Sequence, residues 1–349
     1  MAKLEKLEFD VRGMTCPSCE LHVVNAIKSV DGVQSVEIPG WQSAEAEVLA
    51  EEGIDGEAFS EAVRAAGYGA TVRARRPMDA EKIASNGKGD GQFDLMVIGG
   101  GSAGFAAAIR GAELGFSVGL VEASEIGGTC VNVGCVPSKT LIRSVELAHL
   151  AGQERFHGIH TSKGPIDWPR VIEHKDELVR DLRKAKYSDV LEAYPEITYI
   201  EGKAQLTGGN GVEIDGEPYS PGKIIVATGA TPWAPPIPGL AEAGYLDSEA
   251  ALDLRELPES MIVLGANAVG LELAQTYARA GTTVTVLELL PRIAPFEDPE
   301  ISALLEEYLV EEGLQIVTGF QTASVEVADG RYVLRGSRGE AELTFEAEQ

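Results

Sequence analysis

A strand–glycine turn–helix–strand pattern occurs twice in this chain, and it constrains the fold more than any other feature. The first copy begins with the apolar run at 94–98, which leads into a glycine-rich turn and a helical pattern through Leu114. The second copy begins about 166 residues later, at Met261. Short apolar runs are typical of buried parallel strands, and parallel neighbours need a crossover helix between them. The repeat therefore predicts two α/β units with parallel sheets.

The first turn has the G-x-G-x-x-G spacing of a dinucleotide-binding site. In this motif the first glycine makes the tight turn, the second lets the backbone approach a pyrophosphate, and the third lets helix pack on strand. The N-terminal end of the helix directs its partial positive charge at the diphosphate. Glu122 ends the next strand, where a carboxylate can accept a hydrogen bond from a ribose hydroxyl. An ordinary glycine-rich turn is the alternative. The residues predicted to hold the cofactor here are Gly99, Gly101, Ser102, Ala103 and Gly104.

The second turn carries Gly265 and Gly270, but Asn267 stands in place of the middle glycine. A side chain there is tolerable if the turn stays intact. Glu288 ends the following strand, and an acid at that position accepts from a free ribose 2′-hydroxyl and repels a 2′-phosphate. This favours NADH, although Arg292 lies close behind and would suit NADPH, so both remain open. A solvated surface acid is the alternative for Glu288.

Cys130 and Cys135 follow Glu122 closely, in a segment that also holds Gly134. Gly134 permits an unusual backbone, and Lys139 supplies a cation that favours a thiolate or a reduced flavin. This spacing after a dinucleotide fingerprint predicts a redox-active disulfide. Two buried structural cysteines are the alternative.

The other two cysteines, Cys16 and Cys19, form a C-x-x-C motif before a helical pattern. Two thiolates on a loop that precedes a helix suit two-coordinate Cu(I) or Hg(II). They do not complete a tetrahedral zinc site. A thioredoxin-like redox motif is the alternative, but the alternation and helix periods around it predict the order βαββαβ, which is ferredoxin-like.

Composition and periodicity divide the chain into four parts. Residues 1–76 are predicted to form the small ferredoxin-like α+β metal-binding domain, and 77–92 are predicted to form a flexible linker. Residues 93–246 are predicted to form the FAD-binding domain with the redox cysteines. Residues 247–349 are predicted to form an incomplete NAD(P)-binding domain, also Rossmann-like.

The segment from Gly127 to Lys139 resembles the active-site signature of the flavin disulfide reductases, the family of glutathione reductase and dihydrolipoamide dehydrogenase. The resemblance implies that Cys135 is the charge-transfer thiolate beside the flavin and Cys130 the interchange thiol. It places Lys139 near flavin N5, paired with Glu272. Further cofactor contacts implied by the resemblance are Gly128, Thr129, Thr228 and Gly229.

The run Gly13-Met14-Thr15-Cys16-x-x-Cys19 resembles the G-M-T-C-x-x-C of heavy-metal-associated domains. The two halves together resemble the mercuric reductases. That family reduces Hg(II) to Hg(0) with NAD(P)H, through FAD and a cysteine pair. The resemblance implies Hg(II), or its thiol complexes, as substrate and a homodimer as the intact enzyme. The four cysteines are the expected metal ligands. The alternatives are a dihydrolipoamide- or glutathione-type reductase with an accessory metal domain, or a non-catalytic metal-binding fragment.

The chain stops at Gln349, where this family begins the last strand of its nicotinamide domain. We therefore expect a fragment that lacks the second FAD segment, the dimerisation domain and a C-terminal cysteine pair. FAD binding is expected to be weakened, and turnover low or absent.

The formal net charge of −26 argues against nucleic acid as the main partner. No signal peptide or membrane span is expected, and paired cysteines without a signal indicate cytoplasmic metal or redox chemistry. His22 and His149 are expected to be packing or surface residues rather than ligands.

Overall fold

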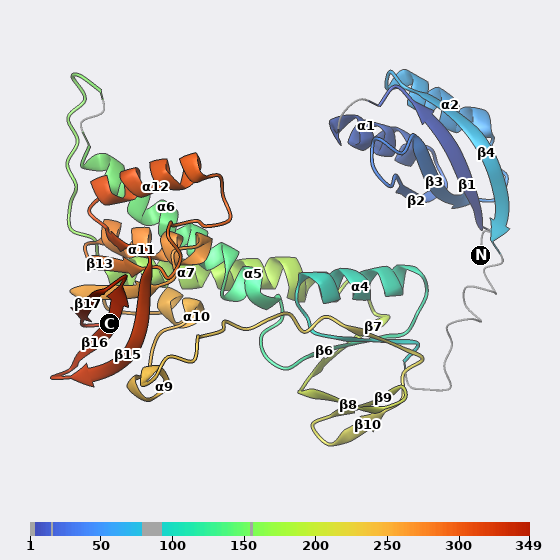
Figure 1. Ribbon diagram of the computed structural model, residues 1–349. Helices are drawn as coiled ribbons and strands as arrows, with labels where there is room; N and C mark the ends of the chain where they lie inside the picture. Colours follow the sequence, from blue (N-terminus) through green and yellow to red (C-terminus); the bar gives the residue numbers. More distant parts are fainter. Residues whose placement is uncertain (1–3, 15–16, 79–92, 154–155) are drawn as a thin grey trace. The chain divides into compact units, whose positions relative to one another are not determined.

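The computed structural model describes residues 4–14, 17–78, 93–153 and 156–349, and the chain divides into two compact units (Figure 1). The N-terminal domain lies in the smaller unit. Its four strands form one antiparallel sheet in the order β2-β3-β1-β4. The predicted order βαββαβ is confirmed. In chain order the elements are β1 (Leu4–Arg12), α1 (Pro17–Lys28), β2 (Val33–Glu37), β3 (Glu45–Glu51), α2 (Gly56–Ala65) and β4 (Gly69–Met78).

The core of this domain follows from the strand and helix periods. Alternate residues of β1, such as Phe9, are buried against α1 and α2, where Ile27 and Phe59 are also fully buried. The domain was predicted to end at residue 76, but β4 continues to Met78. In this extension Pro77 lies opposite Glu5 of β1 in the sheet. β4 is an edge strand, where proline is tolerated. The remainder of the predicted linker, 79–92, lies outside the described residues.

The first α/β part of the larger unit is built on a four-stranded sheet in the order β11-β5-β6-β7. β5 and β6 are parallel, as the apolar runs predicted, and β7, which was not predicted, pairs parallel with β6. Buried residues of α4, including Phe105 and Ala108, pack on this sheet. Three antiparallel strands, β8 to β10, follow β7 and were not predicted. The bounds are β5 (Leu95–Ile98), α4 (Ser102–Glu113), β6 (Val118–Glu122), β7 (Ile197–Glu201), β8 (Ala204–Gly208), β9 (Gly211–Ile214), β10 (Glu217–Tyr219) and β11 (Lys223–Val226).

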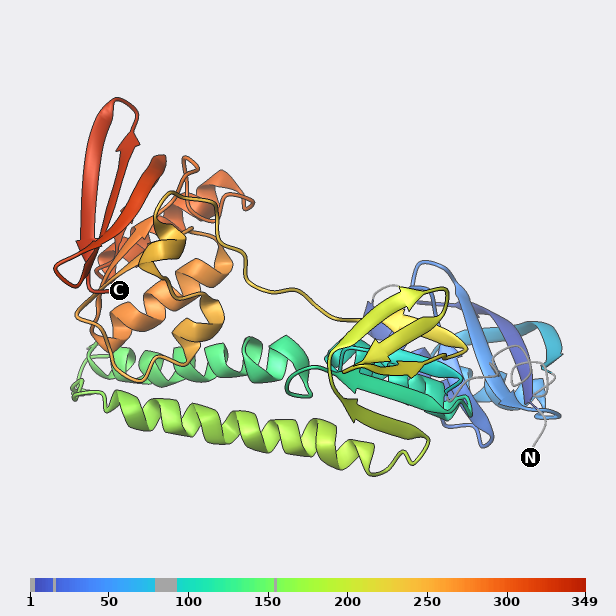
Figure 2. The same ribbon diagram turned by 90° about the horizontal axis from the view of Figure 1, so that it is seen from below.

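Two long helices, α6 and α7, lie side by side and are green in Figure 2. Leu141 of α6 and Trp168 of α7 join a core cluster with Tyr277 from the second nucleotide unit. The rings of Trp168 and Tyr277 have centroids 5.6 Å apart. The helices therefore connect the redox segment to the second nucleotide unit. The helical segments here are α5 (Gly128–Asn132), α6 (Cys135–Ala151), α7 (Trp168–Arg183), the π-helix η1 (Lys184–Ser188) and α8 (Asp189–Leu191).

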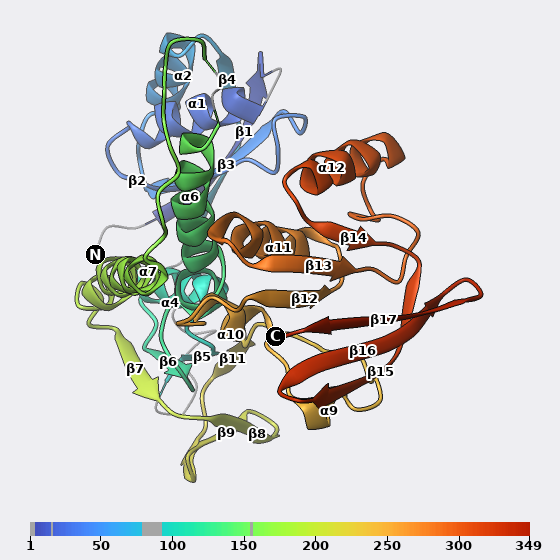
Figure 3. The same cartoon turned by 90° about the vertical axis from the view of Figure 1, so that its left-hand side faces the viewer.

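The second α/β part has a parallel sheet in the order β12-β13-β14. Figure 3 shows α11 and α12 on one side of this sheet and the antiparallel strands β15 to β17 on the other. The backbone of Gln349 exchanges hydrogen bonds with Ser260 and Ile262 of β12. The bounds are α9 (Leu240–Ala243), α10 (Ser248–Leu252), β12 (Ser260–Leu264), α11 (Ala268–Ala280), β13 (Thr283–Leu287), α12 (Pro299–Glu311), β14 (Gln315–Val317), β15 (Phe320–Ala328), β16 (Arg331–Arg338) and β17 (Ala341–Ala347).

Both predicted strand–turn–helix–strand units are present, so the predicted fold class is confirmed. Among the described residues, no helix has the length and apolar character needed to cross a bilayer.

Candidate functional site

The first glycine-rich turn has no room for side chains at its two ends. Gly99 has a φ of +110°, and a Cβ there would lie 2.2 Å from the carbonyl oxygen of Ala227. A Cβ on Gly104 would lie 1.9 Å from the carbonyl oxygen of Gly99. Both distances are far below van der Waals contact, so glycine is required at both positions. The turn consequently holds the start of α4 against the end of β5.

The redox segment begins in backbone contact with this turn. A Cβ on Gly128 would lie 2.6 Å from the Cα of Gly101, and Gly128 has a φ of +62°. The N–H of Gly127 donates to the carbonyl oxygen of Gly100 at 3.0 Å. α4 begins after Gly101 without a side-chain cap, so its first N–H groups are available to an anion. Thr129 follows directly in α5. The glycines keep open a cradle that a dinucleotide diphosphate fits.

Glu122 is bound by the backbone on both carboxylate oxygens. The N–H of Gly100 donates to Oε2 at 2.7 Å, and the N–H of Ser124 donates to Oε1 at 2.9 Å. The carboxylate therefore fixes the turn as well as standing at the position predicted for a ribose contact. Each oxygen retains a lone pair that can accept from a hydroxyl.

Thr228 and Gly229 lie beside the same turn. The N–H of Ala227 donates to the carbonyl oxygen of Ile98 at 2.7 Å, and the backbone nitrogen of Thr228 lies near the Cβ position of Gly99. Gly229 has a φ of +72°, a conformation that favours glycine. Thr228 and Gly229 therefore lie against the Gly99 turn, although they are about 130 residues further along the chain.

Cys130 lies in α5, and Cys135 is the first residue of α6. Both are exposed thiols, so the alternative of two buried structural cysteines is wrong. A hydrogen bond with the Cys135 side chain raises the pKa of Cys130, and burial adds to this. The first turn of α6 offers its positive end to the sulfur of Cys135.

Lys139 and Glu272 are in contact, as the resemblance implied. Nζ of Lys139 donates to Oε2 of Glu272 at 2.6 Å, which joins α6 to α11. Both side chains are about half exposed. The ion pair lies one helical turn beyond Cys135, on the helix that starts at the redox pair.

The second turn repeats the first. Gly265 has a φ of +102°, and a Cβ on Gly270 would lie 2.1 Å from the carbonyl oxygen of Gly265. Asn267 has a φ of −95°, which any residue adopts. It is exposed, whereas its counterpart Gly101 faces Gly128 at close range. This difference explains why a side chain is tolerated in the second turn.

Glu288 is 8% exposed, so the alternative of a solvated surface acid is wrong. The N–H of Ala266 donates to Oε2 at 2.7 Å, and the N–H of Leu290 donates to Oε1 at 2.8 Å. Glu288 therefore has the same arrangement as Glu122 in the first turn.

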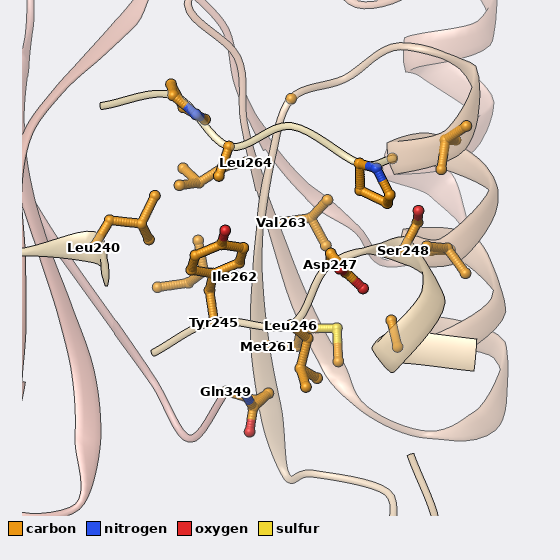
Figure 4. Close-up of a pocket in the computed structure, with 18 of the residues that line it drawn as sticks. Leu240, Tyr245, Leu246, Asp247, Ser248, Met261, Ile262, Val263, Leu264 and Gln349 are labelled. Carbon is orange, nitrogen blue, oxygen red and sulfur yellow. The ribbon is translucent and has the colours of Figure 1, made fainter. Parts of the chain in front are cut away.

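A cavity of about 570 Å³ borders the second turn and runs along β12. Figure 4 shows Leu240 on one side of β12 and Asp247 and Ser248 on the other. The volume of this cavity lies within the range of small-molecule sites. Gly265, Asn267, Gly270 and Glu288 also line it. The cavity is therefore the candidate site for part of the nicotinamide cofactor.

Sequence reasoning assigned no role to Tyr187, in the π-helix. Its ring packs edge-on against Phe105 with centroids 4.8 Å apart, and its hydroxyl lies 3.2 Å from Oγ of Ser102. It also approaches the Cβ position of Gly127. Tyr187 thus covers the start of α4 beside the redox segment. Its sequence signal was weak, because a single tyrosine in a helical run resembles a core residue.

In the metal-binding domain, Cys19 is buried in the first turn of α1, while Cys16 lies outside the described residues. Nδ1 of His22 lies 3.2 Å from the hydroxyl of Tyr68, and the Tyr68 ring borders Gly13. His149 lies near Gln153 and Glu312. Among the described residues, no group of three or more His, Cys, Asp or Glu is placed to hold a metal ion.

Two family models match the chain. The model described as pyridine nucleotide-disulphide oxidoreductase matches residues 93–348, and the heavy-metal-associated domain model matches residues 8–69. A solved structure of the flavoprotein disulfide reductase RclA from Escherichia coli, described as a Cu(II) complex, superposes with a TM-score of 0.62 at 30% identity. The match covers 73% of this chain and 54% of that one.

Relatives named mercuric reductase match across nearly the whole chain. The protein from Lysinibacillus sphaericus is 36% identical over 93% of this chain and 58% of its own length. The protein from Staphylococcus aureus is 37% identical, with 90% and 56% covered. The chain spans less than two thirds of these relatives. The protein from Serratia marcescens is 36% identical over 92% of this chain and 73% of its own length. The chain therefore belongs to the pyridine nucleotide-disulphide oxidoreductase family, within its mercuric reductase branch, and carries a heavy-metal-associated domain.

Proposed function

We propose that this protein reduces Hg(II) to Hg(0) at the expense of NAD(P)H, through FAD and the Cys130–Cys135 pair. The observation that carries the proposal is the position of this pair. It begins two residues after Gly128, which lies in backbone contact with the first dinucleotide turn. Two exposed thiols thus stand beside the FAD cradle, where a soft metal ion can reach them.

The residues of the first turn fit FAD. The N–H groups at the start of α4 would hold its diphosphate, Glu122 would accept from its adenosine ribose, and Thr228 and Gly229 would border it beside the turn. When bound, FAD would supply the relay that passes two electrons from the nicotinamide to the Hg(II) ion held by the sulfur pair. Lys139, held by Glu272, would supply a positive charge to the bound flavin.

The sulfur pair binds the substrate and releases the product. Cys130 and Cys135 each lose a proton and form one bond to Hg(II), which suits two-coordinate thiolate ligation. Two electrons reduce the bound ion to Hg(0), both S–Hg bonds break, and the two thiolates remain. Cys16 and Cys19 collect Hg(II) and deliver it by thiol exchange, in which one thiolate replaces another on the metal.

The proposed setting follows from the same chemistry. Thiol pairs persist in reducing compartments, so we place the activity in the cytoplasm. The partners are Hg(II) thiol complexes and a second copy of the protein.

A single-turnover experiment tests the function. The FAD-loaded protein is first reduced so that Cys130 and Cys135 are thiols, because a disulfide would consume the two electrons of one NADH. It then receives one equivalent of NADH and one of a Hg(II)–thiol complex without oxygen, and NADH absorbance and Hg(0) vapour are followed. We expect vapour from the wild type and none from Cys130→Ser or Cys135→Ser. Cys19→Ser is expected to lose one tight Hg(II) site per chain while vapour still forms.

Other outcomes identify the alternatives. Turnover of lipoamide or glutathione disulfide without vapour would identify an organic disulfide reductase. Tight Hg(II) binding without NADH oxidation would identify a metal-binding protein. Cu(II) is the second metal to test, because the RclA structure is described as a Cu(II) complex.

A further inference from the structure

The Asn132 side chain joins the middle of the redox segment to its start. Nδ2 of Asn132 donates to the carbonyl oxygens of Glu125 and Ile126, in each case at 3.0 Å. The carboxamide has two N–H donors, so these contacts use both of them, and its oxygen remains as an acceptor. Asn132 lies between Cys130 and Cys135 in the chain, so a group that binds its oxygen also holds the segment between the two thiols.

Arg183, in the last turn of α7, is the group that binds this oxygen. Nη1 of Arg183 donates to Oδ1 of Asn132 at 3.3 Å, and the same nitrogen lies 3.0 Å from Oε2 of Glu125. One guanidinium nitrogen therefore contacts the redox segment at two points. The Arg183 side chain is 26% exposed, so salt and water screen these contacts less than at a fully exposed site.

The helix that carries Arg183 is packed on the helix that carries Cys135. α6 begins at Cys135, and α6 and α7 lie side by side (Figure 2). Trp168 and Ile172 of α7 are buried in the same core cluster as Leu141 of α6. Arg183 thus links the part of the redox segment that holds Cys130 to the helix pair that holds Cys135.

This link bears on the distance between the two thiols. The side chains of Cys130 and Cys135 are within hydrogen-bond reach of one another. A disulfide requires Cβ atoms about 3.5–4.5 Å apart, so the two halves of the segment must stay close for the bond to form. Two groups held in place react as if each were at a high local concentration. Loss of the link should therefore favour the separate thiols over the disulfide.

We propose that Arg183 is a positioning residue for the redox pair, which holds Cys130 beside Cys135 through Asn132 and Glu125 and so sets the thiol–disulfide equilibrium of the pair. This inference rests on the redox role of the pair in the proposed function, but not on mercury as the electron acceptor. Glutathione provides a reference couple. Two glutathione thiols give two electrons and two protons to the Cys130–Cys135 disulfide, its S–S bond breaks, and glutathione disulfide forms.

The experiment measures this equilibrium without mercury. The FAD-loaded protein is equilibrated without oxygen in mixtures of glutathione and glutathione disulfide and quenched with acid, and the thiols of Cys130 and Cys135 are alkylated and counted by mass spectrometry. We expect Arg183→Met to shift the equilibrium toward the dithiol by about threefold or more, the effect of losing a partly exposed charged contact. Thermal unfolding shows whether each variant is folded, and Arg183→Gln is the second variant if Arg183→Met does not fold.

Two further variants separate positioning from stability. Arg183→Lys should lie closer to the wild type than to Arg183→Met, because one nitrogen makes both contacts and lysine supplies one charged nitrogen. Arg170→Met is the matched control, since Arg170 lies on the same helix and its ion pair with Glu173 is exposed. It should leave the equilibrium unchanged. A residue that only stabilised the fold would lower the unfolding temperature without moving the equilibrium.

The positioning role is overturned by a shift smaller than about threefold in the folded neutral variant of Arg183, by an equal shift in Arg170→Met, or by a lysine variant that behaves as Arg183→Met does. If the wild type forms no Cys130–Cys135 disulfide even in excess glutathione disulfide, the redox role of the pair in the proposed function fails together with this inference. If the shift is found but the single-turnover experiment yields no Hg(0), the positioning role stands and the substrate assignment fails.

Discussion

Replacement of Gly104 by alanine should prevent FAD binding while the protein remains folded. The added Cβ would lie 1.9 Å from the carbonyl oxygen of Gly99, whereas real Cβ contacts essentially never fall below 3.0 Å. The start of α4 must therefore move away from the turn by about 1.1 Å or more. A shift of that size takes an N–H···O hydrogen bond of about 2.9 Å beyond useful range.

The size of the effect follows from the hydrogen bonds that are lost. Two charge-assisted bonds from the start of α4 to the diphosphate, at about 1.5–3 kcal/mol each, amount to about 3–6 kcal/mol. This corresponds to a roughly 10²- to 10⁴-fold weaker FAD affinity. The effect on folding is smaller, because about 1–3 kcal/mol of overpacking is partly offset by about 1 kcal/mol of helix propensity gained when alanine replaces glycine.

The assay is a titration of the FAD-free protein with FAD, followed by flavin fluorescence, beside thermal unfolding of each variant. Gly270→Ala is the matched control, because its Cβ would lie 2.1 Å from the carbonyl oxygen of Gly265 in the second turn. It should weaken NADH binding and leave FAD affinity within threefold. If Gly104→Ala binds FAD as the wild type does, or if both substitutions weaken both cofactors equally, the steric argument is refuted.

Three further predictions follow from side-chain contacts. Cys135→Ala removes the hydrogen-bond partner that raises the pKa of Cys130, so more Cys130 thiolate is present at a given pH. The alkylation profile of Cys130 with iodoacetamide should therefore shift to lower pH, and an unmoved profile would contradict this. Glu272→Gln breaks an exposed ion pair, so chemical denaturation should show a loss below about 1 kcal/mol. Lys175→Met should destabilise the fold by about 1–2 kcal/mol, because the half-buried Asp176 loses its 2.6 Å partner and keeps only Arg255. A loss no larger than that of Glu272→Gln would show the network to be dispensable.

Local patterns predicted the elements that build the two nucleotide turns. The apolar run 95–98, the glycine spacing and the acid at Glu122 lie within 28 residues, so their arrangement depends on nearby chain alone. The same holds for the second turn and for the alternation in β1 and β3. The predicted bounds differ from the observed ones by a few residues, mainly where a strand extends along its neighbour, as β4 does to Met78.

Other parts of the fold had no decisive local signal. The antiparallel strands β15 to β17 pack on the face of the second sheet through Phe320 and Leu334. α7 is capped by Asp167 and has a helical period, but its partner Tyr277 lies about 109 residues further along the chain. Short apolar runs fit either a strand or a helix until their packing partners are known.

The sequence by itself determined the kinds of chemistry available, which are two dinucleotide turns, a closely spaced cysteine pair after the first turn and a C-x-x-C motif. These depend on residue type and short spacing. Tertiary structure decided which groups meet and which are engaged elsewhere. It brought Lys139 to Glu272 across 133 residues, buried Glu288 on two backbone donors and turned Arg292 onto its own loop. Burial and hydrogen-bond partners are properties of the packed chain, because they depend on atoms that spacing along the sequence does not place.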